Sequence, residues 1–377
     1  MKILIALFRY HYWGGLQSDT LRLCQEAISR GHQVTVFTTS WPGPPAGIQL
    51  ETTPARGWSN VSRMRHFDRA WQERLAQGGY DVAVAMDRVS GADFYFAADS
   101  CLKSYYRRKH PSWLLMLLPR YRFILGMEKR VCGRESRTRV WTIAPMQRTE
   151  FAAEYGTPPE RLLELPTGMR PECVRPADET EAERIRQEVR RELQLQEDDI
   201  AVIQIGSNVI RKGTDRLLKV LGAQPPELLR RLRFVLVGKN LPADVLHMAH
   251  MGGFPTEQLR LTGPRMDVSR LLLGAEMMAH PAREEGTGTV LVEALAAGIP
   301  VVCSGCCGFS PIVAESGGIV IPEPYSPHAM ATAIQEMAAK LPEYTRKARE
   351  YGVAHDFTSR QRVMVDQLEA FIQETRE

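Results

Sequence analysis

The sequence predicts an α/β protein of two doubly wound domains, each with a parallel sheet. Two observations indicate this fold class. Short continuous apolar runs alternate with amphipathic stretches, as in strands that are buried between helices on both faces of a sheet. A break with three prolines at 166–176 separates two such series, and 377 residues are enough for two domains with their own cores.

In the first series, strands are expected at 2–7, 33–38, 81–85, 140–143 and 162–165, with helices at 16–30 and 59–77. In the second, strands are expected at 200–205, 233–237, 259–261, 276–279, 300–303 and 318–321, with helical segments between them. A charged segment at 178–199 follows the proline break and predicts a solvent-facing helix. The predicted domains are 1–168 and 177–358, with ligands expected in a cleft at the carboxyl ends of the strands.

Residues 280–302 carry the strongest functional pattern. A strand ends at His280, a loop of small residues follows, and a helix covers 290–297. The first amides of such a helix favour phosphate. Glu285 and Glu293 bracket this loop, and carboxylates repel phosphate, so they are expected to accept hydrogen bonds from sugar hydroxyls. The predicted phosphate contacts are the backbone groups of Gly286, Thr287, Gly288, Thr289 and Val290. The pattern indicates a nucleotide-sugar site; the alternative is an ordinary strand–helix loop with a charged rim.

The Glu285–Glu293 spacing resembles the E-x7-E motif of the family 4 retaining glycosyltransferases, which have the GT-B fold. The resemblance implies that Glu293 holds the ribose, Glu285 orients the donor sugar and the intervening amides bind the diphosphate. It also implies that the C-terminal helix, 359–377, crosses back to complete the first domain.

Gly14 and Gly15 precede the first helix and form a second backbone element suited to a diphosphate, although a Gly-Gly before a helix is usually only a tight turn. In the resembled family this loop contacts the donor diphosphate. Asp19 lies in the first turn of the helix, where a carboxylate complements the helix dipole. The resemblance suggests that Asp19 faces the donor or acceptor sugar.

Arg211 and Lys212 follow the first strand of the second domain, where two cations would stabilise the charge that develops on a departing nucleoside diphosphate. The resembled family has an Arg/Lys pair at this place. The alternative is a pair of solvated surface cations. No Asp-x-Asp occurs in the chain. We therefore expect no metal and no other cofactor, with the two cations replacing a divalent ion.

Asp99 is expected at the end of a strand, as a candidate to orient the acceptor hydroxyl or take its proton. Many family members place a His in this region. The lipopolysaccharide core heptosyl glucosyltransferases, which this chain resembles over nearly its full length, have an Asp. Retention through a front-face mechanism needs no protein nucleophile, so Asp99 is expected to matter less than Glu285, Lys212 or Arg211.

Residues 103–130 interrupt the α/β pattern with eight Lys or Arg against one Glu, mixed with Trp113 and a Leu/Met cluster. Cations around an apolar and aromatic patch suit an anionic membrane surface. The alternative is that the apolar run at 113–118 packs into the core. A net charge of +4 and no evident stacking platform argue against nucleic acid as a partner.

The resemblance implies transfer of a hexose from a UDP-sugar to an inner-core heptose on a lipid-anchored acceptor. The expected location is cytoplasmic, peripheral to the inner membrane, which agrees with seven mostly isolated cysteines and no evident secretory signal. Two alternatives remain open at this point. One is a UDP-sugar epimerase or phosphorylase on the same fold, and the other is a membrane-surface binding protein with a degenerate nucleotide-sugar cleft.

Overall fold

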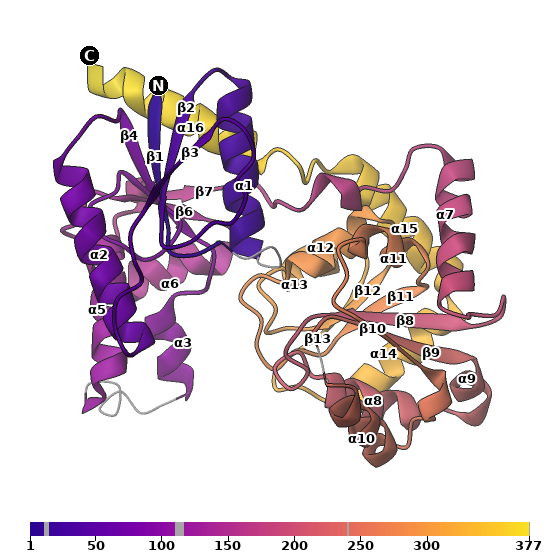
Figure 1. The fold of residues 1–377 in the computed structure, drawn as a ribbon. Helices are drawn as coiled ribbons and strands as arrows, with labels where there is room; N and C mark the ends of the chain where they lie inside the picture. Colours follow the sequence, from indigo (N-terminus) through magenta and orange to yellow (C-terminus); the bar gives the residue numbers. More distant parts are fainter. Residues whose placement is uncertain (11–14, 110–116, 240, 377) are drawn as a thin grey trace. The chain divides into compact units, whose positions relative to one another are not determined.

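The structure is a computed structural model that describes residues 1–10, 15–109, 117–239 and 241–376. Its contacts divide the chain into two units (Figure 1). Unit 1 comprises Met1–Gly168 and Ser359–Glu377, and unit 2 comprises Met169–Thr358. Each contains a parallel sheet.

Unit 1 is built on seven described strands in the order β3-β2-β1-β4-β5-β6-β7. The strands are β1 (Lys2–Leu7), β2 (Gln33–Thr38), β3 (Ile48–Thr52), β4 (Val82–Ala85), β5 (Phe94–Ala97), β6 (Arg139–Thr142) and β7 (Leu162–Glu164). The helices are α1 (Gly15–Ser29), α2 (Asn60–Ala76), α3 (Leu102–Lys109), α5 (Pro119–Cys132), α6 (Pro145–Tyr155), the short η1 (Pro159–Arg161) and α16 (Arg360–Arg376).

The alternation of side chains along β1 explains how this sheet is covered on both faces. Ile3, Ile5 and Leu7 pack with residues of α1 and α16 on one face. Leu4 and Ala6 pack with residues of α2, α5 and α6 on the other. Because successive strand residues point to opposite faces, a strand with two covered faces must be apolar throughout.

Unit 2 has six described strands in the order β10-β9-β8-β11-β12-β13. They are β8 (Ile200–Ile205), β9 (Leu232–Val237), β10 (Leu259–Gly263), β11 (Met277–His280), β12 (Val301–Ser304) and β13 (Ile319–Ile321). The helices are η2 (Pro171–Cys173), α7 (Glu179–Glu192), α8 (Thr214–Gly222), α9 (Pro226–Arg231), α10 (Pro242–Gly252), η3 (Thr256–Gln258), α11 (Val268–Leu273), α12 (Thr289–Ala296), α13 (Ser310–Glu315), α14 (Pro327–Ala339) and α15 (Leu341–Ala354).

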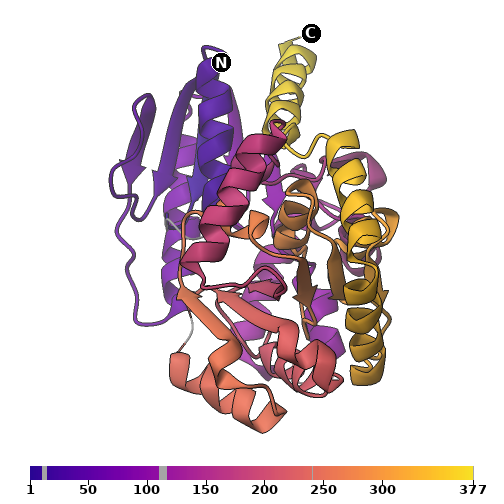
Figure 2. The same cartoon turned by 90° about the vertical axis from the view of Figure 1, so that its right-hand side faces the viewer.

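The second sheet is also covered on both faces. One core joins it to α7, α11, α12 and α15, and the other joins it to α8, α10 and α14. Figure 2 views unit 2 from the side on which α7, in magenta, lies. The strand order reverses between β8 and β11, which makes their carboxyl ends a topological switch point, where open α/β sheets bind ligands.

These observations confirm the predicted fold class. Both sheets are parallel and doubly wound, and α16 returns to unit 1, where it lies against α1. The contact includes Arg30, whose Nη1 lies 2.6 Å from the Asp366 carboxylate, and His32, whose Nε2 lies 2.8 Å from Glu369. Among the described residues, no helix is both long and apolar enough to cross a bilayer.

Candidate functional site

The loop between β11 and α12 takes its shape from two glycines. Gly288 has a φ of +84°, which favours glycine, and a Cβ there would lie 3.2 Å from Cγ of Glu285. Gly308 lets the loop after β12 approach closely, because its Cβ would lie 2.1 Å from the Gly286 carbonyl oxygen. The amide of Phe309 donates to the Thr287 carbonyl at 2.8 Å. The small-residue loop is therefore held by its neighbour as it leads into α12.

Glu285 is the centre of the polar cluster at the switch point. Its carboxylate contacts the ammonium of Lys212 and lies 3.1 Å from Nε2 of His280. Burial alone would raise the pKa of Glu285, but the hydrogen bond from His280 and the charge of Lys212 outweigh it and lower that pKa to about 2. Burial lowers the pKa of His280, so the ring is neutral and its Nε2–H donates to the carboxylate.

Lys212 reaches Glu285 across Gly206, the glycine that follows β8. A Cβ at Gly206 would lie 3.0 Å from Cγ of Lys212, so the lysine stem packs over the bare backbone there. Gly213, with a φ of +72°, brings the same loop against the end of β11: its Cβ would lie 2.0 Å from the Pro281 carbonyl oxygen.

Arg283 ties these two loops together. Its guanidinium contacts both Asp215 carboxylate oxygens, at 2.6 and 2.7 Å, and its amide donates to the Arg211 carbonyl at 2.9 Å. The Arg211 side chain is exposed on the same loop as Lys212. The structure therefore brings the candidate cations, Glu285 and the glycine loop to one edge of the sheet, with Val290 in the first turn of α12.

Glu293 lies further along α12 and is buried. The Arg170 guanidinium binds it through two contacts, Nε–Oε1 at 2.9 Å and Nη2–Oε2 at 3.2 Å. Burial alone would lower the pKa of Arg170, but the hydrogen bond to Glu293 raises it. A carboxylate accepts more than two hydrogen bonds, so this pair leaves capacity for a hydroxyl.

In unit 1, Asp99 follows β5 and its side chain is 71% exposed. One carboxylate oxygen lies 3.3 Å from Nη1 of Arg88, and its carbonyl accepts from Gln147 at 3.0 Å. The exposed carboxylate is thus available to an acceptor while its backbone is fixed.

Asp19 is placed differently from Asp99, because it is buried and paired between α1 and α16. It accepts from Arg22 at 2.6 Å and from Gln361 at 2.9 Å, and Arg360 lies 3.5 Å away. The contacts show it as an anchor for α16. Gly15 begins α1 with open space around its Cβ position, whereas Gly14 lies outside the described residues.

Two members of the site were not assigned from the sequence. His280 ends a strand as part of an apolar run, which gave no sign of its contact with Glu285 five residues later. Arg170 lies in the proline-rich break at 166–176, 123 residues before Glu293, and no local sequence pattern pairs them.

The arginine- and lysine-rich segment at 103–130 includes most of α3 and α5, and Trp113 in it lies outside the described residues. Its Glu128 is buried and accepts from the amides of Leu102 and Lys103, at 2.9 and 3.1 Å, and from the Tyr155 hydroxyl at 2.7 Å. The single acid of this segment therefore fixes the start of α3 and adds no negative charge to the surface.

Comparison with known proteins places both halves of the chain in glycosyltransferase families. Residues 13–172 match the model "Glycosyltransferase Family 4", and residues 185–354 match "Glycosyl transferases group 1". The lipopolysaccharide glucosyltransferase WaaG of Escherichia coli (strain K12) is 30% identical over 367 residues, 95% of this chain and 96% of that protein. The D-inositol 3-phosphate glycosyltransferase of Stackebrandtia nassauensis is 25% identical over 373 residues, 89% and 81% of the two chains.

Among solved structures, the crystal structure of WaaG, described as a glycosyltransferase involved in lipopolysaccharide biosynthesis, superposes with a TM-score of 0.88. It is 28% identical to this chain, and the match covers 97% of this chain and 98% of that one.

Proposed function

The chain belongs to the family 4 glycosyltransferases, and from that premise we propose that it transfers a hexose, with retention, from a UDP-sugar to an inner-core heptose of lipopolysaccharide. The observation that carries the proposal is the cluster of Lys212, His280 and Glu285 beside a glycine loop at the switch point of unit 2. The similarity to WaaG supports the acceptor.

The donor would bind across this cluster. The diphosphate lies against the amides of residues 286–290 and takes Lys212 as a counter-ion, with Arg211 joining from the same loop. Glu285 then accepts hydroxyls of the hexose, and its low pKa, about 2, keeps it an acceptor at neutral pH. Glu293 accepts the ribose hydroxyls while Arg170 holds its orientation.

Chemistry at the anomeric carbon breaks the bond to the diphosphate and leaves extra negative charge on its oxygens. Lys212 and Arg211 stabilise that charge directly, which lowers the barrier. The acceptor hydroxyl attacks the anomeric carbon from the same face of the hexose that the diphosphate leaves. Its proton passes to a diphosphate oxygen. In this proposal Asp99 orients the acceptor and the backbone of Gly14 and Gly15 contacts the donor diphosphate, while Asp19 anchors α16.

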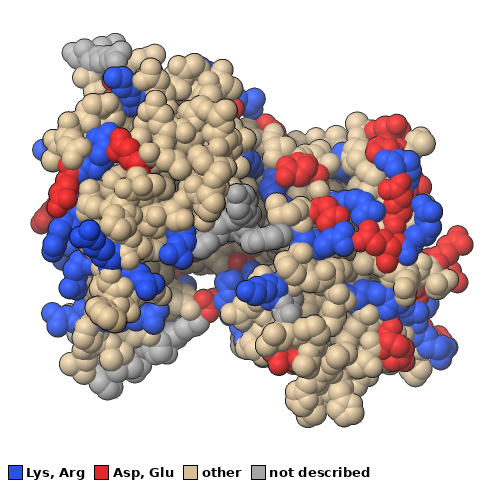
Figure 3. Space-filling model, viewed as in Figure 1, with Lys and Arg blue, Asp and Glu red and all other residues tan. Residues whose placement is uncertain are grey.

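Unit 1 also presents a surface suited to the anionic cytoplasmic face of a membrane. Figure 3 shows Lys and Arg gathered on the part of unit 1 formed by α2, α3 and α5. Arg107, Arg108 and Arg130 are 52–56% exposed. Their partners Glu154, Glu150 and Asp68 are only 10–14% exposed, so the outer charge is positive.

Exposed apolar side chains lie at the starts of α2 and α5, two of the elements that carry the Lys and Arg side chains of this surface. Leu117 and Leu118 are exposed at the start of α5, and Trp58, just before α2, is fully exposed. The guanidinium of Arg65 lies 5.1 Å from the Phe123 ring, which places the first half of α2 beside α5. Cations around exposed apolar groups favour peripheral membrane binding, where a lipid-anchored acceptor would be met.

The test is UDP release from UDP-glucose, UDP-galactose and UDP-N-acetylglucosamine, each with a core lipid that ends in heptose. We expect turnover with one donor that depends on the lipid. D-inositol 3-phosphate serves as the competing acceptor. Turnover with that acceptor and none with the lipid would contradict the proposed acceptor. Consumption of UDP-sugar without any acceptor would instead indicate an epimerase or a phosphorylase, and no turnover with any pair would contradict the activity.

A further inference from the structure

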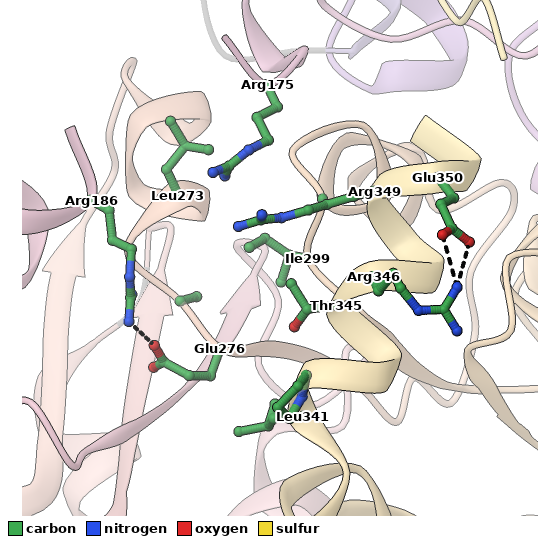
Figure 4. Close-up of a pocket in the computed structure, with 13 residues that line it drawn as sticks. Arg175, Arg186, Leu273, Glu276, Ile299, Leu341, Thr345, Arg346, Arg349 and Glu350 are labelled. Carbon is green, nitrogen blue, oxygen red and sulfur yellow. Dashed lines mark hydrogen bonds and ion pairs between the residues drawn. The ribbon is translucent and has the colours of Figure 1, made fainter. Parts of the chain in front are cut away.

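Unit 2 contains a cavity of about 520 Å³ at the amino-terminal edge of its sheet (Figure 4). Glu276 and Ile299 line it directly before β11 and β12, whereas Glu285 follows the carboxyl end of β11. The four residues of β11 separate the two edges by roughly 13 Å. The lining residues are Arg175, Arg186, Leu273, Ala275, Glu276, Gly298, Ile299, Leu341, Pro342, Thr345, Arg346, Arg349 and Glu350.

Two arginines from different elements extend into this cavity. Arg175 comes from the segment after η2, and Arg349 comes from α15; in Figure 4 their guanidinium groups point into the same space. Gly298, with a φ of +77°, makes room for both. A Cβ there would lie 2.7 Å from Cγ of Arg349 and 3.5 Å from Cδ of Arg175, so the aliphatic parts of both side chains pack against the Gly298 backbone.

These two guanidinium groups share one carboxylate. Arg175 donates to Glu179 through Nη2 at 2.8 Å and through Nε at 3.2 Å, whereas Nη1 of Arg349 lies 3.7 Å from the same carboxylate, whose side chain is 66% exposed. Two positive charges against one solvated carboxylate leave an excess of positive charge directed into the cavity. An anion placed between the guanidinium groups would complete their hydrogen bonding.

The acids in the lining do not cancel this charge. Glu276 is bound by Arg186 at 2.9 Å, by Arg190 at 2.8 Å and by the amide of Ala201 at 2.7 Å. Within α15, Nη1 of Arg346 donates to both carboxylate oxygens of Glu350, at 2.8 and 2.9 Å, and Figure 4 draws these two contacts. Both lining carboxylates therefore have their own cations.

Apart from the hydroxyl of Thr345, the uncharged part of the lining is apolar and would contact the uncharged part of a ligand. Leu273 ends α11 and Ala275 follows it in the loop before β11, and Leu341 and Pro342 come from the start of α15. A volume of about 520 Å³ falls in the range of small-molecule sites.

We infer that this cavity is a second ligand site, which binds a small phosphate monoester. Its phosphate lies between Arg175 and Arg349, and its sugar or other organic body lies against Leu273 and Ile299. A phosphate dianion matches two guanidinium groups in charge and in oxygen count better than a single carboxylate does. The site is separate from the proposed donor site, since the two lie at opposite edges of one sheet.

The test is calorimetric titration of the full chain with glucose 6-phosphate, with glucose as the uncharged control. We expect the phosphate ester to bind and glucose not to bind. Arg349→Met should weaken binding at least tenfold, because it removes one of two counter-charges while keeping a stem over Gly298. The matched control is Arg184→Met, since Arg184 is exposed on α7, paired with Glu181 and outside the cavity; it should bind as the unchanged chain does.

Lys212→Ala distinguishes the two sites. It should leave glucose 6-phosphate binding unchanged while it weakens UDP binding. Loss of glucose 6-phosphate binding in Lys212→Ala, with binding retained in Arg349→Met, would place the anion at the proposed donor site and overturn the inference. Absence of binding to the unchanged chain would overturn it as well. A crystal soaked with glucose 6-phosphate should show phosphate density between Arg175 and Arg349.

Discussion

At Glu285, a buried carboxylate is stabilised by an ammonium from one loop and an imidazole from the end of its own strand. The sequence predicted that Glu285 and Lys212 would each follow a strand of the second domain, because both come after apolar runs. It did not predict that they would touch, or that His280 would join them. Those contacts depend on β8 and β11 being neighbours in the sheet, and that adjacency is a property of topology.

Glu285→Gln removes the charge that orients Lys212 and accepts sugar hydroxyls. We expect kcat/KM for the UDP-hexose to fall by about 10²–10³-fold, the range for loss of a group that stabilises the transition state. Circular dichroism should show an unchanged fold. The control is Glu284→Gln, one residue earlier, which should keep most of the activity. Equal losses in the two variants would contradict the role of Glu285.

The low pKa of Glu285 also predicts a pH dependence of stability. The folded pKa, about 2, lies below the ordinary value of 4.5, so the carboxylate stabilises the fold above 4.5 and loses this contribution as pH falls towards 2. The loss should be about 1 kcal/mol by pH 4 and about 3 kcal/mol at pH 2. Urea unfolding of the unchanged chain and of Glu285→Gln at pH 6 and pH 4 measures it: the difference between them should shrink at pH 4, and a constant difference would contradict the low pKa.

Among elements, most helices and strands were predictable from periodicity, and β3 was not. Its residues, Ile48–Thr52, form an edge strand in which polar and apolar side chains mix, directly after a stretch rich in proline and glycine. Such a strand lacks the continuous apolar run that marks the central strands. By contrast, α12 begins one residue before the expected helix, because Gly288 adopts the left-handed conformation that precedes it.

The contact of α16 with α1 yields a prediction about Asp19. Arg360 is almost fully buried, and Asp19 is the carboxylate beside it. Asp19→Ala leaves that guanidinium without its counter-charge, so we expect unit 1 to lose about 3 kcal/mol of unfolding free energy. The control is Asp366→Ala, which breaks an exposed pair between the same helices and should cost less than about 1 kcal/mol. Denaturant titration compares them, and similar losses would contradict the anchoring role.

For the whole molecule, the two-sheet fold was predictable because two series of apolar runs, separated by the proline-rich break at 166–176, can be recognised in the sequence itself. The pairing of Arg170 with Glu293 was not, since it joins distant segments of unit 2. The proposed membrane surface agrees with the proposed lipid-anchored acceptor, since such an acceptor would be met at a bilayer.

The membrane proposal predicts binding to vesicles that contain anionic phospholipid. A variant with Arg120→Gln, Arg122→Gln and Lys129→Gln removes three exposed cations from α5. Each contributes about 1 kcal/mol near an anionic surface, so partitioning should fall by about 10²-fold. A variant with Arg184→Gln, Arg191→Gln and Lys340→Gln removes the same charge from exposed positions of unit 2 and should bind nearly as the unchanged chain does. An equal loss of vesicle binding in both variants would indicate a general effect of net charge and would contradict a specific membrane surface on α5.

The most direct test is calorimetric titration of UDP into the full chain in buffer with EDTA. We expect UDP to bind without a divalent ion, and Lys212→Ala to weaken binding at least tenfold, because amides and fixed cations hold the diphosphate. Absence of UDP binding, or binding that appears only when Mg²⁺ replaces EDTA, would contradict the proposed donor site.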